Sequence, residues 1–504
     1  MKTIYLLLSG ILCLSSALSV AHGKDYGEGH QNFTESKVLK NKDGSHDHWR
    51  GIGRFTTKLG NCTATLLDTQ DPSASLPTPA YVLTSGHCTE LTNANIVTNS
   101  PIQGFMQFNY FTDTAPQNYV LKKIAWRSIQ GVDLAIIELD VSLQTLLKEG
   151  IQPLRLATSR PADGTDALIV GAPLGFDEIT LRLAACTLQP AGEIVEGPWV
   201  WRNTLMTRCK DIKGGSSGSP LLDRRTNQII GVIGTGNLTI QAYPCERHAP
   251  CVPVGGRYIA IPGNVYGNPT NFLSGCFVRG RLVQDETSFC PLYPVFSVSA
   301  AADSPQRYRR VGKKDDGSAD IPTWNYNFSI DTPFYRHKTV RTAMDCKHAP
   351  GYSGTISAKN AFINTAIGDQ PGLYFLCILG VDSADQRPEE GLTNNALSLP
   401  AEILDNTPTP PPELSFTAGV QVLTTENEPP SRTYAYKYGP TGTTDCSDKT
   451  DYSTSEYIYV WLENSDLPGK LCTIAYDLSK QASEPRTDIL PPTPAKPKDV
   501  PDAP

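Results

Sequence analysis

Short apolar runs recur between turn-forming residues along positions 55–265. They span residues 62–67, 81–84, 133–139, 167–171, 228–233 and 257–261. Apolar runs of four to eight residues bounded by Gly and Pro predict β-strands, and residues 141–148 are a short helical candidate. The pattern therefore predicts an all-β domain over this part of the chain.

Two segments farther along the chain share a second pattern. Each has Asp-Cys, a Tyr six residues after that Cys, and then a second Cys within an apolar run, at positions 345–382 and 445–477. Aromatic residues alternate upstream, at 324, 326 and 328 and at 434, 436 and 438, which is the period of a strand. We predict two copies of a small, disulfide-containing, β-sandwich-like module. The aromatic rows are interpreted as buried faces in preference to exposed platforms that stack on sugar rings.

Proline-rich segments and the two modules set the remaining boundaries. We expect the modules at 293–400 and 414–487, a Pro-rich linker at 401–413 and a disordered Pro-rich tail at 488–504. At the other end, Lys2, an apolar run over 4–14 and Ser19-Val20-Ala21 predict a signal peptide over 1–21. Residues 22–50 are polar, show no apolar period and include His30, His46 and His48. We interpret them as a disordered leader or propeptide in preference to a metal-binding segment.

Composition narrows the class of protein. A net charge of −7 over 504 residues gives no basic face for nucleic acid, and no run of 18 apolar residues predicts a membrane span. Of the 13 cysteines, Cys13 lies in the predicted signal peptide, which leaves an even number for disulfides in an exported protein. Pairing between sequence neighbours is the simplest arrangement, although the partners of Cys209, Cys245 and Cys251 stay open. No spacing suggests a zinc site, and nothing in the sequence indicates a cofactor.

Three motifs carry candidate chemistry. Thr84-Ser85-Gly86-His87-Cys88 follows an apolar strand, Asp133 begins another, and Gly215-Ser216-Ser217-Gly218-Ser219-Pro220 precedes a third. A serine hydroxyl needs a neighbouring base before it can attack a carbonyl, and the imidazolium that forms needs a carboxylate to orient it. We therefore assign His87 as base, Asp133 as its orienting group and Ser217 as nucleophile. The backbone N–H groups of Gly215 and Ser217 would form an oxyanion hole.

The order and surroundings of these motifs resemble the chymotrypsin-like (trypsin-fold) serine peptidases, and secreted bacterial members in particular. The resemblance covers residues 51–292 and implies a double β-barrel. It also places Cys62 and Cys88 where a disulfide would brace the histidine loop. Animal members carry an Asp directly before the nucleophile, where this chain has Ser216. We therefore expect activity that does not depend on a newly cut N-terminal amine.

The same resemblance suggests a substrate pocket. Asp211 stands six residues before Ser217, where family members place the floor of the pocket, and a carboxylate there would favour Arg or Lys before the scissile bond. Gly234, Gly236 and Gly256 match positions that line an open pocket. The plainer interpretation is that Asp211 is an exposed loop residue beside Cys209.

The sequence thus predicts a secreted, extracellular serine endopeptidase that acts on polypeptides without metal or cofactor. The alternative is a catalytically silent homologue that works as an extracellular binding or adhesive protein. An esterase is disfavoured because the His-Asp-Ser order differs from that of α/β-hydrolases. The C-terminal modules are expected to act as appendages, with a surface or a glycan as a conceivable ligand.

Overall fold

The computed structural model is built almost entirely of β-strands. It describes residues 24–73, 77–237, 245–284, 290–292, 295–300, 305–417, 421–424, 431–456, 458–461 and 467–491. The expected signal peptide lies outside these residues, as does the tail beyond residue 491. Within the described ranges, no helix is long and apolar enough to cross a membrane.

The first sheet closes on itself. Strands β7 (Gln117–Ser128), β6 (Gly104–Phe108), β2 (Ile52–Thr57), β3 (Gly60–Leu66), β4 (Pro79–Thr84) and β8 (Leu134–Ser142) pair in that order, and β8 pairs back to β7. This gives a six-stranded barrel with β5 (Val97–Pro101) added at β7. Its interior is filled by inward-facing apolar residues such as Phe55, Val82 and Ile137. The expected helix is α1 (Leu143–Lys148), whose N-terminus is capped by the Ser142 hydroxyl.

The second sheet has ten strands and follows the first barrel in the chain. Its order is β1 (Lys37–Val38), β10 (Arg182–Thr187), β9 (Asp166–Gly171), β13 (Pro220–Asp223), β14 (Ile229–Gly236), β17 (Val265–Pro269), β12 (Trp199–Thr207), β11 (Gln189–Glu196), β15 (Cys251–Val254) and β16 (Arg257–Ala260). Among the described residues its end strands β1 and β16 do not pair. The first sheet is thus a closed barrel. In the second sheet only Leu188 separates β10 from β11, so one bent stretch of chain borders both β9 and β12.

The segment before the first barrel is ordered, which corrects the expectation of a disordered leader. Strand β1 pairs with β10, and the side chains of Leu39 and Trp49 are fully buried in the core shared by the two sheets. Asp25 accepts a hydrogen bond of 2.8 Å from Arg224. The sequence did not reveal these contacts, because the few apolar residues of 22–50 follow neither a helix nor a strand period.

All six expected neighbour pairs are disulfides. They join Cys62 to Cys88, Cys186 to Cys209, Cys245 to Cys251, Cys276 to Cys290, Cys346 to Cys377 and Cys446 to Cys472. The first connects β3 to the loop that carries His87. The Cys276–Cys290 pair follows the second sheet and spans the hairpin of β18 (Phe277–Val278) and β19 (Arg281–Leu282), directly after η3 (Asn271–Cys276).

The first C-terminal module is made of two principal sheets. One has the order β20 (Val298–Ala300), β24 (Tyr326–Ile330) and β27 (Phe362–Ile363). The other has the order β21 (Tyr308–Arg309), β29 (Leu397–Ile403), β28 (Gly372–Val381), β25 (Phe334–Val340) and β26 (Ile356–Ser357). Trp324, Tyr326 and Phe328 are all buried, as expected for one face of a sandwich. Strand β29 runs three residues into the segment 401–413 that was expected to be linker.

The second module has the same core order of strands. Strands β30 (Leu414–Thr417), β31 (Gln421–Thr424) and β34 (Tyr459–Trp461) form one sheet, and β33 (Ser453–Ser455), β32 (Ser431–Pro440), β35 (Gly469–Asp477) and β36 (Arg486–Leu490) form the other. The hydroxyls of Tyr352 and Tyr452 donate to the carbonyls of Cys346 and Cys446 in their respective modules. The aromatic rows, however, lie on different strands, since Tyr326 is on β24 and Tyr434 is on β32.

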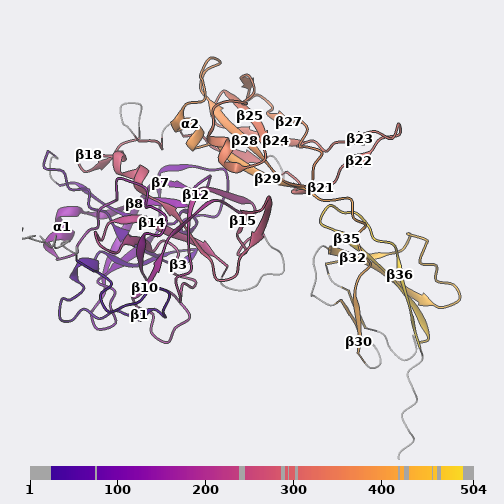
Figure 1. Ribbon diagram of the computed structural model, residues 1–504, viewed down its shortest axis with the longest axis horizontal. Coiled ribbons are helices and arrows are strands. Elements are labelled where there is room, and N and C mark those ends of the chain that lie inside the picture. The colour runs from indigo at the N-terminus through magenta and orange to yellow at the C-terminus, as the bar shows by residue number, and fades with distance from the viewer. Residues whose placement is uncertain are drawn as a thin grey trace, which may run out of the picture.

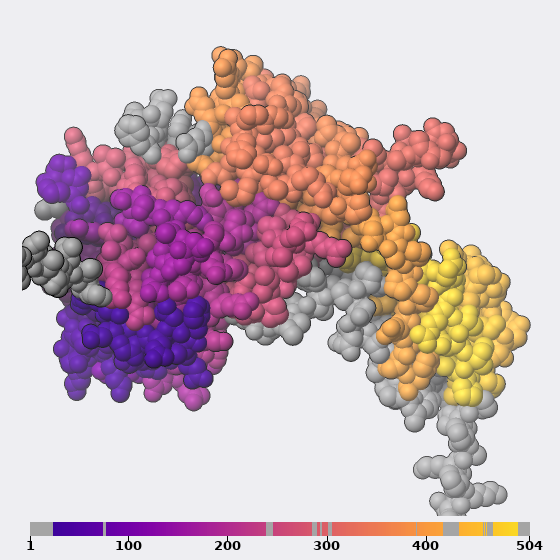
Figure 2. Space-filling model, in the orientation of Figure 1, coloured from indigo at the N-terminus to yellow at the C-terminus, as the bar shows by residue number. Residues whose placement is uncertain are grey.

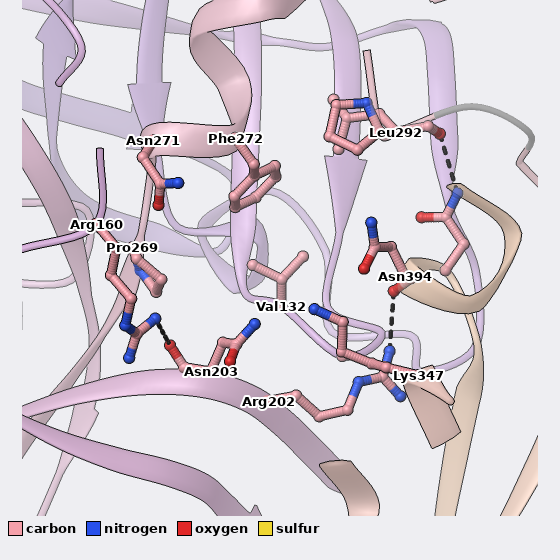
Figure 3. Close-up of a pocket in the computed structure, with 13 residues that line it drawn as sticks. Val132, Arg160, Arg202, Asn203, Pro269, Asn271, Phe272, Leu292, Lys347 and Asn394 are labelled. Atoms are coloured by element: carbon pink, nitrogen blue, oxygen red, sulfur yellow. Dashed lines mark hydrogen bonds between the residues drawn. The ribbon is translucent and has the colours of Figure 1, made fainter. Parts of the chain in front are cut away.

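The first module packs along the domain formed by the first two sheets, whereas the second module stands apart (Figures 1 and 2). At the junction, Arg202 on β12 reaches residues 394–398 of the module, and Gln130 donates to the carbonyl of Asn395. A cavity of about 250 Å³ lies there, lined by residues of both domains including Val132 and Asn394 (Figure 3). The second module is held to the first by a 2.5 Å ion pair between Arg310 and Asp477.

Candidate active site

Two neighbouring strands of the barrel bring His87 and Asp133 together. His87 lies in the short turn η2 (Gly86–Cys88) directly after β4, and Asp133 directly precedes β8, the antiparallel partner of β4. The Asp133 carboxylate is fully buried and accepts two hydrogen bonds from one residue: from His87 Nδ1 at 2.7 Å and from the His87 backbone N–H at 2.9 Å. This double contact fixes the ring and leaves Nε2 as the proton-accepting nitrogen.

Electrostatics suit His87 to act as a base. Burial by itself would lower the pKa of His87, but the charge and hydrogen bond of Asp133 outweigh it, so the pKa is raised above its usual value. Asp133 thereby stabilises the imidazolium that forms when the ring takes a proton. A base of this kind is most effective above its own pKa, where it is neutral.

Ser217 lies in the loop between β12 and β13, and this loop is tied to both sheets. Its carbonyl accepts from the Thr63 N–H on β3 at 2.8 Å, and the next residue, Gly218, donates to the Ile233 carbonyl on β14 at 2.8 Å. The φ angles of Gly215 and Gly218 are 88° and 84°, in the left-handed region that glycine adopts without strain. The loop is therefore held in one conformation by glycine geometry and by contacts on two sides.

The backbone N–H groups of Gly215 and Ser217 have no hydrogen-bond acceptor within the described parts of the chain. Two unengaged donors in one tight loop are what an oxyanion hole requires. The Ser217 hydroxyl itself donates to the Gly234 carbonyl at 3.5 Å. No hydrogen bond joins it to His87 Nε2 among the described residues, although both side chains line the same cavity of about 210 Å³.

The predicted pocket residues divide into two groups. Gly234 and Gly236 line the cavity with Ser217, but Asp211 and Gly256 do not. Asp211 instead accepts hydrogen bonds from the backbone N–H and the hydroxyl of Ser36, at 2.8 and 2.9 Å. Gly256 lies in the turn between β15 and β16 and faces open space. The carboxylate of Asp211 thus binds the N-terminal segment and is not part of the cavity that contains Ser217.

Several lining residues carry no family motif and were missed in the sequence. The largest are Trp199 and Trp201, on one face of β12, whose rings stack 6.1 Å apart. Glu196, Arg247 and His248 also line the cavity. The alternation of Trp199 and Trp201 is a sequence signal for one strand face, but nothing in the sequence says that this face borders the cavity.

The described side chains near His87 do not form a metal site. Within the described ranges, the one group of three potential metal ligands is Cys62, His87 and Cys88. Both cysteines are joined in a disulfide, so no thiolate is available to bind an ion.

Comparisons with known proteins agree with this geometry. Residues 62–232 match the family of trypsin-like peptidase domains, and the chain therefore carries such a domain. No curated protein sequence matches the chain.

Solved structures of serine proteases are similar to part of the chain. The protease Anisep from Arthrobacter nicotinovorans is 18% identical, with 44% of this chain and 90% of that chain covered and a TM-score of 0.29. A Glu endopeptidase is 18% identical, with 47% and 90% covered and a TM-score of 0.31. A thermostable serine protease from an extremophilic microorganism is 15% identical, with 44% and 92% covered and a TM-score of 0.28.

Proposed function

We propose that this protein is a secreted serine endopeptidase that cleaves polypeptides through an acyl-enzyme on Ser217. The observation that carries the proposal is the pair of hydrogen bonds by which the buried Asp133 holds His87. A peptidase domain implies polypeptide substrates, and the disulfides are consistent with an extracellular protein. Secretion itself rests on the signal peptide predicted from the sequence.

The proposed reaction uses the residues as follows. His87 Nε2 takes the proton of the Ser217 hydroxyl as the oxygen attacks the scissile carbonyl, and Asp133 stabilises the imidazolium. The N–H groups of Gly215 and Ser217 stabilise the tetrahedral oxyanion, at about 3–4 kcal/mol per donor. The imidazolium then protonates the leaving amine. Water, activated by the same ring, releases the acyl group and restores Ser217.

Two structural features support activity without a new N-terminus. Ser216 occupies the position of the animal Asp, and its hydroxyl accepts from the Lys213 N–H at 3.3 Å. Gly51 is buried, and its carbonyl accepts a hydrogen bond from the Leu66 N–H at 2.8 Å. The uncut chain is therefore packed into the fold at the position where activation by cleavage would require a new N-terminus. We further propose that β10 and β11 act as one bent strand that closes the second sheet into the family's second barrel; the single residue between them supports this.

The two C-terminal modules are proposed to be copies of one unit. Their matching strand order and the matching tyrosine contacts support this. Because Trp324 and its neighbours are buried, any surface or glycan ligand of the first module would have to use other side chains.

Labelling by a serine-directed fluorophosphonate tests the enzyme proposal. The wild-type protein should be labelled, and Ser217→Ala should not. Ser219→Ala is the matched control, since it removes another hydroxyl from the same loop, one without a hydrogen-bond partner in the described structure. Labelling that is absent from the wild type, or equal in Ser217→Ala, would favour the silent homologue.

A further inference from the structure

A buried carboxylate without a counter-ion lies beside the proposed active site. Glu196, at the end of β11, is 3% exposed and lines the same cavity as Ser217. Its Oε1 accepts from the His248 N–H at 2.8 Å, and its Oε2 is buried without a partner of hydrogen-bonding geometry. A carboxylate removed from water in this way is unfavourable until a cation or a donor reaches it.

Within the described residues, no Lys or Arg forms a salt bridge with Glu196, although a hydrogen bond from Thr235 and the charge of His87 act to lower its pKa against the effect of burial. The cavity is also lined by His87, Lys213, Arg247 and His248. Lys213 and Arg247 are exposed, and their charged groups lie over the rings of Phe176 and Trp199 instead. Residues 238–244, which precede this wall of the cavity, contain no Lys, Arg or His.

The neighbouring side chains suit a long basic group. Trp199 and Trp201 form a stacked apolar wall in the same cavity. Aromatic rings pack against the methylene groups of a Lys or Arg side chain and attract its cationic end. A carboxylate at the end of the pocket would then form an ion pair with that cation. Burial raises the pKa of Glu196, and an incoming cation would reverse that shift.

We propose that Glu196 is the specificity-determining residue that selects a basic side chain of the substrate, in the role that the sequence had suggested for Asp211. This inference rests on the proposed serine endopeptidase function and deepens it. Gly236, which family resemblance places at the pocket for the residue before the scissile bond, lines the same cavity. We therefore assign the basic residue to that position.

Peptidyl phosphonates that differ only in the side chain before the reactive phosphorus test the assignment. Four probes are used on the full chain, with Arg, Lys, Leu or Glu at that position. The wild type should be labelled at least about tenfold faster by the Arg and Lys probes than by the Leu probe, as expected for a hydrogen-bonded charge pair. In Glu196→Gln the ratio of the Arg or Lys rate to the Leu rate should fall most of the way to one.

The matched control is Glu193→Gln. Glu193 is a buried carboxylate on the same strand, but it bonds to Tyr258 and to the Met344 N–H and does not line the cavity. This variant should keep the preference for basic probes. Thermal unfolding of both variants shows whether each is folded.

The outcomes separate the two proposals. No labelling of the wild type by any probe would mean that the endopeptidase proposal fails. Labelling with equal rates for basic and neutral probes, or a preference for the Glu probe, would overturn the assignment of Glu196 alone. An equal loss with every probe in Glu196→Gln would also overturn it, because Glu196 would then act on His87 and not on the substrate side chain.

Discussion

Replacing Arg202 should loosen the first C-terminal module from the peptidase domain. The Arg202 guanidinium is buried at the junction, where Nη1 donates to the Ala396 carbonyl at 2.9 Å and to the Ser398 hydroxyl at 2.6 Å. Nη2 donates to the Asn394 carbonyl at 2.9 Å (Figure 3). Burial lowers the pKa of Arg202 to about 10, so the group is still charged at neutral pH.

Substitution Arg202→Met keeps much of the apolar stem and removes all three donated hydrogen bonds. A hydrogen bond from a charged donor contributes about 1.5–3 kcal/mol, and the acceptors left behind stay buried. The cost of burying the charge is no longer incurred, which offsets part of the loss. We expect the junction to be weakened by about 2–4 kcal/mol, which enlarges the open population roughly 30- to 900-fold.

Amide hydrogen exchange at Met344 measures this opening. Its N–H donates across the junction to Glu193 Oε2 at 2.6 Å, so it is protected only while the domains are docked. Exchange in a peptide covering residues 342–347 should accelerate at least about 30-fold in Arg202→Met.

Arg160→Met is the control for this experiment. Arg160 lines the same cavity, but it donates to the Asn203 and Thr204 carbonyls of its own domain. Unchanged exchange in Arg202→Met, or equal acceleration in both variants, would refute the reasoning.

Two further predictions concern the catalytic residues. Asp133→Asn should lower kcat/KM by about 10⁴-fold, as loss of the orienting carboxylate does in this triad, and should move the acidic limb of the pH–rate profile to lower pH. The sign follows because Asp133 raises the pKa of His87, so the wild type loses its neutral base at a higher pH as the solution is acidified. A limb that does not move would contradict this. Gly86→Ala should destabilise the domain by about 1–3 kcal/mol in urea denaturation, since the new Cβ would lie 2.3 Å from the Ser128 carbonyl oxygen. Unchanged stability would show that the turn can shift.

The approach of His87 to Asp133 and the tight loop at Ser217, the proposed catalytic residues, could be predicted because each depends on a short local motif. Gly86-His87-Cys88 and the Gly-Ser loop around Ser217 specify their own backbone geometry, and Asp133 begins a strand that must pair with the one before His87. Disulfide pairing was predictable for a related reason, since each pair joins sequence neighbours. Local sequence thus determined these parts of the site.

The substrate pocket could not be predicted in the same way, because its walls come from distant strands. Asp211 occupies the family position, but Ser36, 175 residues away in the chain, binds its carboxylate. Glu196 lies in the cavity through the pairing of β11 with β12 and β15, which no short motif encodes. The pairing of β1 with β10 was likewise not predicted, because β1 comes from a segment that showed no strand period.

The N-terminal segment extends the folding unit beyond the residues that define the family. Strand β1 covers the outer edge of β10, and a chain starting at residue 62, where the family match begins, would leave that edge bare. Exposed strand edges recruit other chains and lead to aggregation. A soluble, autonomous catalytic unit should therefore include residues 24–50 together with both sheets.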